Sequence, residues 1–329
     1  KKLKLKTSPI KFQLSESNEN KPLILIIIDE LAPSKEVFKF TNSEKDFEFD
    51  NFLKTQGFIL RPNFKTHSQQ TKVSLTSMFN FNLRESKWIQ DFEINNNQFS
   101  TTPEFNVLFK GNLLIDSLSK KGIKSYSFGK VNFNLGSDYN KDIFYTWENI
   151  GFDSFNYLFQ ENKIFKSFFK KSILSFIDSK LYTNHPIDYE RKQNFELLNS
   201  ISPKKNSFYY FHIDAPHQPF SYFNEFPLIE ITLYDINDSY DSSKKYDNDL
   251  FKMSYSKYRR FVLKKIISIL KSEKFKDCKI IIVGDHGLRN VTDFDPFSTI
   301  GAFYGFNIGD VMKLNEAQDI GSLINQNFN

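Results

Sequence analysis

Two apolar runs that end in polar residues constrain the fold of this chain most. The first run, Leu23–Ile28, is followed by Asp29-Glu30, and the second, Ile280–Val283, is followed after a glycine by Asp285-His286. Continuous apolar runs of this kind are typical of strands buried on both faces, as in a parallel sheet. In open α/β sheets, ligand sites lie at the carboxyl ends of the strands. Two strands that deliver acids to the same edge therefore indicate a metal site.

The rest of the chain alternates between segments with strand-like and helix-like patterns. We expect strands at 58–60, 123–128 and 207–213, and helices within 43–57, from about 71, within 108–121 and at 254–272. This alternation predicts an α/β fold with a mostly parallel central sheet and helices on both faces. Neither an internal repeat nor a second domain boundary is evident, so residues 21–329 are expected to form one catalytic domain.

The first twenty residues differ from the remainder of the chain. They begin Lys-Lys-Leu-Lys-Leu-Lys and continue into a polar segment, so we interpret residues 1–20 as a basic polar tether. Either a membrane anchor or signal upstream of Lys1 or a trimmed flexible tail explains such a start. No apolar run in the sequence approaches the roughly 20 residues that span a bilayer.

Charge and cysteine content exclude few classes of function. The net charge of +5 comes from 44 basic and 39 acidic residues mixed along the chain, which does not indicate nucleic-acid binding. A polyanionic or membrane-surface substrate is compatible with it. The single cysteine, Cys278, excludes an internal disulfide and leaves the redox compartment undecided.

A hydroxyl-rich segment, 66–77, is a second candidate functional region. It leads into apolar residues at helical spacing, so we expect a helix to begin around Thr71 to Ser74. Helix N-termini favour anions because their free N–H groups and the helix dipole both attract negative charge. A hydroxyl there is well placed for phosphate or sulfate chemistry.

Four motifs occur in an order that resembles a known family. They are Asp29 after the first strand, the helix start Thr71–Phe79, the turn Pro216–Phe220 with its histidine His217, and Asp285-His286-Gly287. From Pro22 to about Asn307 the chain resembles the sulfatase-like branch of the alkaline phosphatase superfamily. The segment Gly122–Lys130 is similar to the second signature of sulfatases, which implies that Lys130 faces the substrate anion.

The helix start departs from the sulfatase pattern. Common sulfatases carry Cys/Ser-x-Pro-Ser-Arg, whereas residues 71–75 read Thr-Lys-Val-Ser-Leu, so only Ser74 is kept. Threonine cannot be converted to formylglycine. The segment instead resembles phosphoethanolamine and phosphoglycerol transferases, in which an unmodified threonine attacks phosphorus. Those enzymes follow a membrane segment, which implies the extracytoplasmic face of a membrane in the cell envelope. The phosphoethanolamine enzymes also carry several disulfides, which this chain cannot form.

The resemblance implies one divalent metal ion, held by Asp29, Thr71, Asp285 and His286. Zinc or manganese is expected, and calcium is compatible with the oxygen-rich ligands. Thr71 is the expected nucleophile, and His217 and Lys130 are expected to contact the anionic group of the substrate. A single metal is expected because no histidine follows His286.

Several neighbouring residues have alternative roles. Glu30 is an alternative or second ligand, and Asp214 would serve a second metal if one binds. His212 is expected to be a core or sheet-facing histidine, and neither His67 nor His185 carries a motif that assigns it a role.

The sequence thus favours a metal-dependent phosphotransferase or phosphodiesterase acting on a phospholipid or glycan headgroup. Two alternatives remain at this stage. One is a sulfuric-ester hydrolase that works without formylglycine, which the missing arginine after Ser74 disfavours. The other is a catalytically inactive homologue that binds a glycan or a partner.

Overall fold

The computed structural model describes residues 21–82, 112–129, 186–218, 220 and 249–328. The strands among these residues form one six-stranded sheet. Its strand order is β2-β6-β5-β1-β4-β3. The strands are β1 (Leu23–Ile28), β2 (Ile59–Lys65), β3 (Lys124–Gly129), β4 (Ser207–Ile213), β5 (Lys279–Gly284) and β6 (Ser298–Tyr304). Strand β1 pairs in parallel with β4 and β5, and β3 pairs in parallel with β4, whereas β6 is antiparallel to β5 and β2. The expected α/β fold with a mostly parallel sheet is confirmed.

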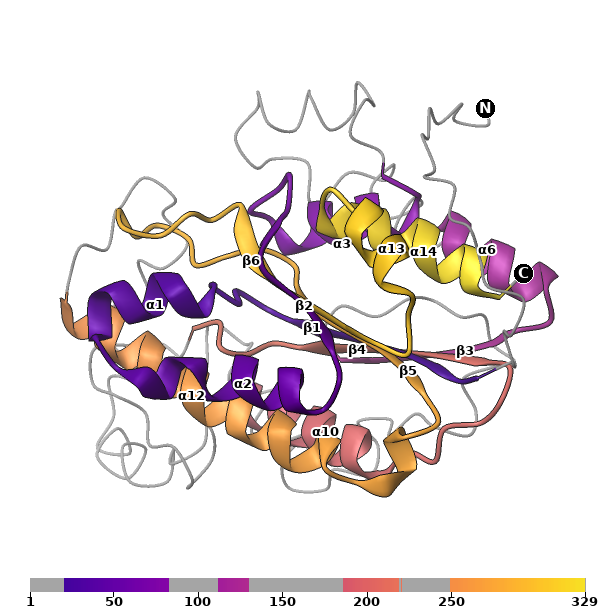
Figure 1. The fold of residues 1–329 in the computed structure, drawn as a ribbon, viewed down its shortest axis with the longest axis horizontal. Coiled ribbons are helices and arrows are strands. Elements are labelled where there is room, and N and C mark those ends of the chain that lie inside the picture. Colours follow the sequence, from indigo (N-terminus) through magenta and orange to yellow (C-terminus); the bar gives the residue numbers. More distant parts are fainter. Residues whose placement is uncertain (1–20, 83–111, 130–185, 219, 221–248, 329) are drawn as a thin grey trace, which may run out of the picture.

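Helices cover both faces of this sheet, as Figure 1 shows with the sheet seen nearly edge-on. One face carries α1 (Ser34–Thr41), α2 (Glu48–Thr55), α10 (Pro186–Ser200) and α12 (Asp249–Leu270). The other carries α3 (Thr71–Phe79), α6 (Leu113–Lys120), α13 (Ile308–Lys313) and α14 (Ile320–Asn327). Short 3₁₀ turns are η1 (Glu44–Phe47), η4 (Glu273–Phe275) and η5 (Ala317–Asp319).

The central strand β1 supplies both cores. Its side chains alternate, as in any strand, so Ile24, Ile26 and Ile28 join the cluster under α12 while the other three join the cluster under α3. All six are fully buried. An apolar residue is needed on both faces, which explains why this strand shows no polar alternation.

The register of β1 with its neighbours positions the functional edge of the sheet. Ile28 lies opposite Ile213 of β4 and opposite Gly284 of β5. The next residue of each strand is an aspartate, so Asp29, Asp214 and Asp285 leave the sheet at the same level. The carboxyl ends of β1, β4 and β5 therefore present acids at one edge, as the two apolar runs predicted.

Strand β2 differs from its expected length. We expected a strand that ends at Leu60, because Pro62 follows, but β2 continues to Lys65 with a register shift between Arg61 and Phe64. Proline is tolerated in an edge strand, where one row of backbone groups needs no ladder partner. The expected strand at 58–60 was therefore too short at its carboxyl end.

Other expectations differ mainly at their boundaries. The helix expected from residue 254 begins earlier, at Asp249, and α6 begins at Leu113 after the capping residue Asn112, whose side chain accepts a hydrogen bond from Ile115. The strands expected at 123–128 and 207–213 are confirmed as β3 and β4.

The tether at 1–20 and Lys130 lie outside the described residues. Among the helices that the structure describes, none has the length and apolar character needed to cross a bilayer.

The contact between α14 and α3 generates a stability prediction. A Cβ atom added at Gly321 would lie 1.9 Å from the carbonyl oxygen of Met78, at the end of α3. Gly→Ala in an open helix position is stabilising by about 1 kcal/mol. Here we expect Gly321→Ala to destabilise the protein by about 1–3 kcal/mol, as overpacking does.

Chemical denaturation measures this change. Gly309→Ala in α13 is the control, because its added Cβ would approach only the side-chain oxygen of Asn307, at 3.1 Å. Its free energy of unfolding should stay within about 1 kcal/mol of the parent value. Equal or greater stability of Gly321→Ala would contradict the close packing of the two helices.

Candidate metal and catalytic site

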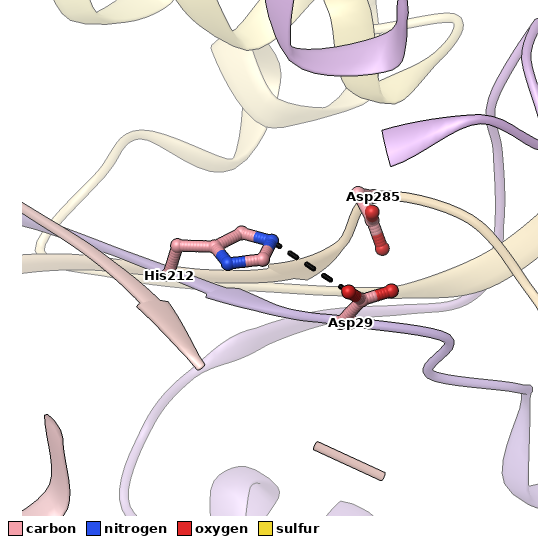
Figure 2. A group of neighbouring side chains, drawn as sticks. All are labelled: Asp29, His212 and Asp285. Carbon is pink, nitrogen blue, oxygen red and sulfur yellow. Dashed lines mark ion pairs between the residues drawn. The ribbon is translucent and has the colours of Figure 1, made fainter. Parts of the chain in front are cut away.

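Three buried side chains converge where β1, β4 and β5 end. Asp29, His212 and Asp285 each offer one ligand atom, and these atoms lie within 4.8 Å of one another. Figure 2 shows the three side chains pointing toward a common centre, with His212 Nε2 3.9 Å from Asp29 Oδ2. His212 and Asp285 are 0% exposed and Asp29 is 4% exposed. Two carboxylates and an imidazole are donors that zinc and manganese accept.

Strand alternation explains why these three side chains meet. Along β4, Phe208 and Tyr210 face the cluster under α3, and His212 is the next residue on that face. Asp29 and Asp285 continue the same alternation from β1 and β5, whose inward residues Ile27 and Val283 belong to that cluster. All three therefore point to the side of the sheet that α3 covers.

Sequence reasoning missed the position of His212. The prediction of a buried, sheet-facing histidine agrees with its burial, but the structure also brings it beside Asp29 and Asp285. The signal lay in the period-2 count along β4, which puts His212 on the same face as Tyr210. That count becomes informative only with the register between strands, which pairs His212 with Ile27 and Gly129.

Thr71 and His286 lie against the same cluster. Thr71 is the first residue of α3, and its Oγ1 is 3.4 Å from Asp29 Oδ1 and 3.2 Å from His286 Nε2. His286 Nδ1 donates to the carbonyl of Gly287 at 2.8 Å, which leaves Nε2 as the lone-pair nitrogen facing the threonine. The four residues expected to hold a metal, Asp29, Thr71, Asp285 and His286, are thus brought together.

The carboxylate of Asp285 has one tethered and one unpaired oxygen. Its Oδ1 accepts the backbone N–H groups of Glu30, at 3.2 Å, and His286, at 2.9 Å. Its Oδ2 is buried and accepts no hydrogen bond from the described residues, although His286 Nε2 lies 3.4 Å away. A buried carboxylate oxygen without a donor is costly unless a cation satisfies it. The donor set at this edge therefore fits a divalent metal ion.

Burial controls the protonation of these groups. Burial, and then the negative charge of Asp285, raises the pKa of Asp29 to about 7. Burial also raises the pKa of Asp285 to about 6, and it lowers the pKa of His286 to about 4. Two neighbouring acids resist full ionisation, and the imidazole is neutral near pH 7.

A second network of hydrogen bonds fixes the backbone of Asp285. Its carbonyl accepts Ser74 Oγ at 2.8 Å and Thr66 Oγ1 at 3.1 Å. Gln318 Nε2, from η5, donates to both hydroxyls, at 2.7 Å and 2.8 Å. Ser74, the one residue retained from the sulfatase motif, therefore orients a residue of the candidate metal site. Gln318 was missed by sequence reasoning because it lies beyond the matching motifs.

The remaining expected residues are placed as follows. His217 is bonded through Nδ1 to the carbonyl of Gln218, at 2.6 Å, and through Nε2 to Arg289 Nη2, at 2.9 Å. Burial alone would lower the pKa of His217, but the nearby carboxylates of Glu30, Asp29 and Asp214 outweigh burial and raise this pKa. Because Arg289 can only donate, its hydrogen bond to Nε2 is formed with the neutral ring. Lys130 and His185 lie outside the described residues.

The Glu30 carboxylate has another partner, and the backbone of Asp214 is bonded to an arginine. The Glu30 carboxylate is ion-paired with Arg289 Nε at 2.7 Å. Although burial alone would raise the pKa of Glu30, Arg289 lowers it below its usual value. The carbonyl of Asp214 accepts a hydrogen bond from the buried Arg191 at 2.5 Å. His67 Nδ1 lies 3.4 Å from Glu316 Oε1.

The family model described as Sulfatase matches residues 22–296, which is most of the chain. The protein belongs to the sulfatase family, within the sulfatase-like branch of the alkaline phosphatase superfamily. This family includes metal-dependent enzymes, both sulfatases and phosphoethanolamine transferases. A search of the curated proteins finds no match.

Solved structures with a similar fold have low sequence identity. A putative sulfatase from Bacteroides thetaiotaomicron is 13% identical with a TM-score of 0.54, covering 92% of this chain and 69% of its own. BT1596, a 2-O GAG sulfatase, is 13% identical with a TM-score of 0.51, covering 88% and 65%. The C-terminal periplasmic domain of phosphoethanolamine transferase EptC from Campylobacter jejuni is 15% identical with a TM-score of 0.47, covering 92% and 87%. The first two likenesses support the sulfatase-like fold.

The Ser74 network generates a prediction about metal affinity. Ser74→Ala removes the shorter of the two hydroxyl bonds to the Asp285 carbonyl, and we expect a loss of about 10–100-fold in metal affinity. Titration of metal-free protein with zinc measures it. Ser77→Ala, at another fully buried serine of α3, is the control and should bind zinc like the parent. Unchanged affinity in Ser74→Ala would show that the hydroxyl does not support the site.

The raised pKa of Asp29 generates a prediction about stability. The folded protein holds this proton more tightly than the unfolded chain, so the resulting stability is present at low pH and is lost as pH rises from about 4 through 7. In a chelator at pH 8, Asp29→Asn should therefore be more stable than the parent by about 1–3 kcal/mol. The difference should vanish near pH 4.

Added zinc should reverse this order, because it stabilises the parent and not Asp29→Asn. Thermal unfolding at the two pH values, with and without zinc, tests both halves. Asp50→Asn is the control, since burial raises the pKa of Asp50 too, but it is hydrogen-bonded to Ser34 near α1. If Asp29→Asn and Asp50→Asn respond equally to zinc, Asp29 is not part of a metal site.

Proposed function

We propose that this protein is a metal-dependent phosphotransferase or phosphodiesterase with Thr71 as its nucleophile. The observation that carries the proposal is the position of the Thr71 hydroxyl. It lies at the N-terminus of α3, within 3.4 Å of Asp29 Oδ1 and 3.2 Å of His286 Nε2, beside a donor set that fits a divalent ion. A hydroxyl between an acceptor and a metal site is an activated nucleophile.

Zinc or manganese is the metal we propose, with calcium as a weaker candidate. Asp29, Asp285, His286 and the Thr71 oxygen would hold it, and His212 completes the donors on the β4 side. When bound, such an ion lowers the pKa of a coordinated hydroxyl and polarises a phosphoryl oxygen.

The protein residues then account for the transfer step. Thr71 Oγ1 forms a bond to phosphorus as the ester P–O bond breaks, and its proton passes to the Asp29 carboxylate, since the Nε2 lone pair of His286 would be occupied by the metal. The departing alcohol oxygen takes up a proton from solvent water. The phosphothreonine is then resolved by an acceptor hydroxyl or by water, which attacks phosphorus and releases Thr71. The amide groups at the start of α3 favour the negative charge of the bound phosphoryl group.

Phosphorus is preferred to sulfur because threonine cannot become formylglycine. The place of the motif arginine is taken by Leu75, which is fully buried in the core under α3. We propose a phospholipid or glycan headgroup as substrate, with Lys130 facing its anionic group. The proposed location is the extracytoplasmic face of a membrane in the cell envelope, with residues 1–20 as the tether of the domain 21–329.

Detection of the covalent intermediate tests the nucleophile. We expect zinc-loaded protein incubated with a chromogenic phosphodiester, phosphatidylethanolamine or phosphatidylglycerol to gain mass at Thr71, measured by intact-mass and peptide mass spectrometry. Thr71→Ala should lose both the added mass and at least about 10³-fold of the turnover, the scale of losing a nucleophile. Thr76→Ala is the control, because Thr76 is fully buried on the same helix.

The same assay, run also with chromogenic sulfate esters, separates the alternatives. Turnover of sulfate esters and not phosphate esters, still dependent on Thr71, would replace the proposal with sulfate-ester hydrolysis. Bound metal with no turnover of either ester class would favour an inactive binding homologue. Turnover that survives Thr71→Ala would rule out the threonine mechanism.

A further inference from the structure

Arg289 is a partly buried charged residue that the sequence motifs leave without a role. It lies four residues after Asp285, and its side chain is 20% exposed. Nε donates to Glu30 Oε1 at 2.7 Å, and Nη2 donates to His217 Nε2 at 2.9 Å. An ion pair in this setting fixes both the position and the orientation of a guanidinium group.

The partners of Arg289 place it at the rim of the metal site. Glu30 follows Asp29 directly, and its backbone N–H donates to Asp285 Oδ1 at 3.2 Å. A fixed cation therefore stands against Glu30, the residue that follows Asp29 and whose backbone holds Asp285 Oδ1.

The hydrogen bonds of His217 determine what this histidine offers to a substrate. Nδ1 donates to the carbonyl of Gln218, so Nε2 accepts the proton of Arg289 Nη2. A ring held in this way has no N–H left to donate to an anion. The backbone of His217 is fixed as well, because the buried Arg191 donates a hydrogen bond to its carbonyl oxygen at 2.6 Å. Its arrangement suits the orientation of Arg289 better than direct contact with a negative oxygen.

We propose that Arg289, oriented by Glu30 and His217, is the cationic contact for the non-bridging oxygens of the phosphoryl group that Thr71 receives. This inference rests on the proposed function and assigns a charged substrate-binding residue to it. Asp29, Glu30 and Asp285 carry negative charge at the site. Arg289 together with a divalent ion offsets these charges, so that a phosphate ester meets no net repulsion. Glu30 and His217 then act as positioning residues.

Phosphate binding to the zinc-loaded full chain tests the proposal independently of turnover. We expect Arg289→Ala to raise the dissociation constant for inorganic phosphate at least tenfold in calorimetry, and Arg289→Lys to raise it less. Methylguanidinium should restore part of the phosphate affinity of Arg289→Ala. Metal content and thermal unfolding of each variant are measured in parallel.

The chain offers a matched control. Arg260 is also 20% exposed, and its Nε donates to the buried Asp46 at 2.6 Å, in the contact between α12 and η1. Arg260→Ala should lower stability and leave phosphate affinity unchanged. If Arg289→Ala behaves like Arg260→Ala, Arg289 is only a structural clamp and the inference fails. If Arg289→Ala also loses zinc, Arg289→Lys is the deciding variant. Zinc content equal to that of the parent, with phosphate affinity weakened at least threefold, supports the inference. Unchanged phosphate affinity in Arg289→Lys overturns it.

The outcomes also separate this inference from the proposed function. A parent protein that forms phosphothreonine, with Arg289→Ala still binding phosphate normally, would overturn the role of Arg289 alone. Arg289-dependent phosphate binding in a parent protein that forms no phosphothreonine would support that role and contradict the transfer reaction.

Discussion

The candidate site depends on the parallel pairing of β1 with β4 and β5. The backbone N–H of Asp29 donates to the carbonyl of Ile213 at 3.0 Å, so the ladder continues one residue beyond the strand and fixes the Asp29 backbone. Because Ile28 lies opposite both Ile213 and Gly284, a shift of one residue would turn every side chain to the other face. The relative positions of the candidate metal-binding side chains are thus set by the hydrogen bonds of the sheet, and a sheet holds side chains more rigidly than a loop does.

The same arrangement carries an energetic cost that the core outweighs. Burial of Asp29 next to Asp285 disfavours their ionised forms, by a few kcal/mol when no cation is present. The six fully buried side chains of β1 each contribute about 1.5–3 kcal/mol by transfer from water, as an upper bound. Their sum exceeds the cost, so a strand that is apolar on both faces can end in acids that are poised for a cation.

How much of this was predictable varies with the physical cause. The strands at 23–28 and 207–213, the helix beginning at Thr71 and the clustering of Asp29 with Asp285 follow from local pattern and from the rule for strand ends. The place of His212 beside them does not, because it depends on the register between β1 and β4. The pairing of β6 with β2 and the support from Gln318 depend on contacts across more than 200 residues, for which the local sequence carries no periodic signal. The extension of β2 through Pro62 was missed because an edge position is a property of the whole sheet.

Adjacent Asp29 and Glu30 show how one backbone feature divides two acids between two tasks. The sequence suggested Asp29 as a ligand and Glu30 as an alternative or second ligand. Glu30 has a φ of +57°, which is uncommon for a residue other than glycine, and this turns the chain directly after the strand. Asp29 stays on the face toward α3, beside His212 and Thr71, while the Glu30 carboxylate reaches Arg289. Since Arg289 already neutralises Glu30, this acid is a poorer partner for a cation than Asp29. The turn therefore separates a carboxylate that is available to a metal from one that fixes a guanidinium, although the two residues are neighbours in sequence.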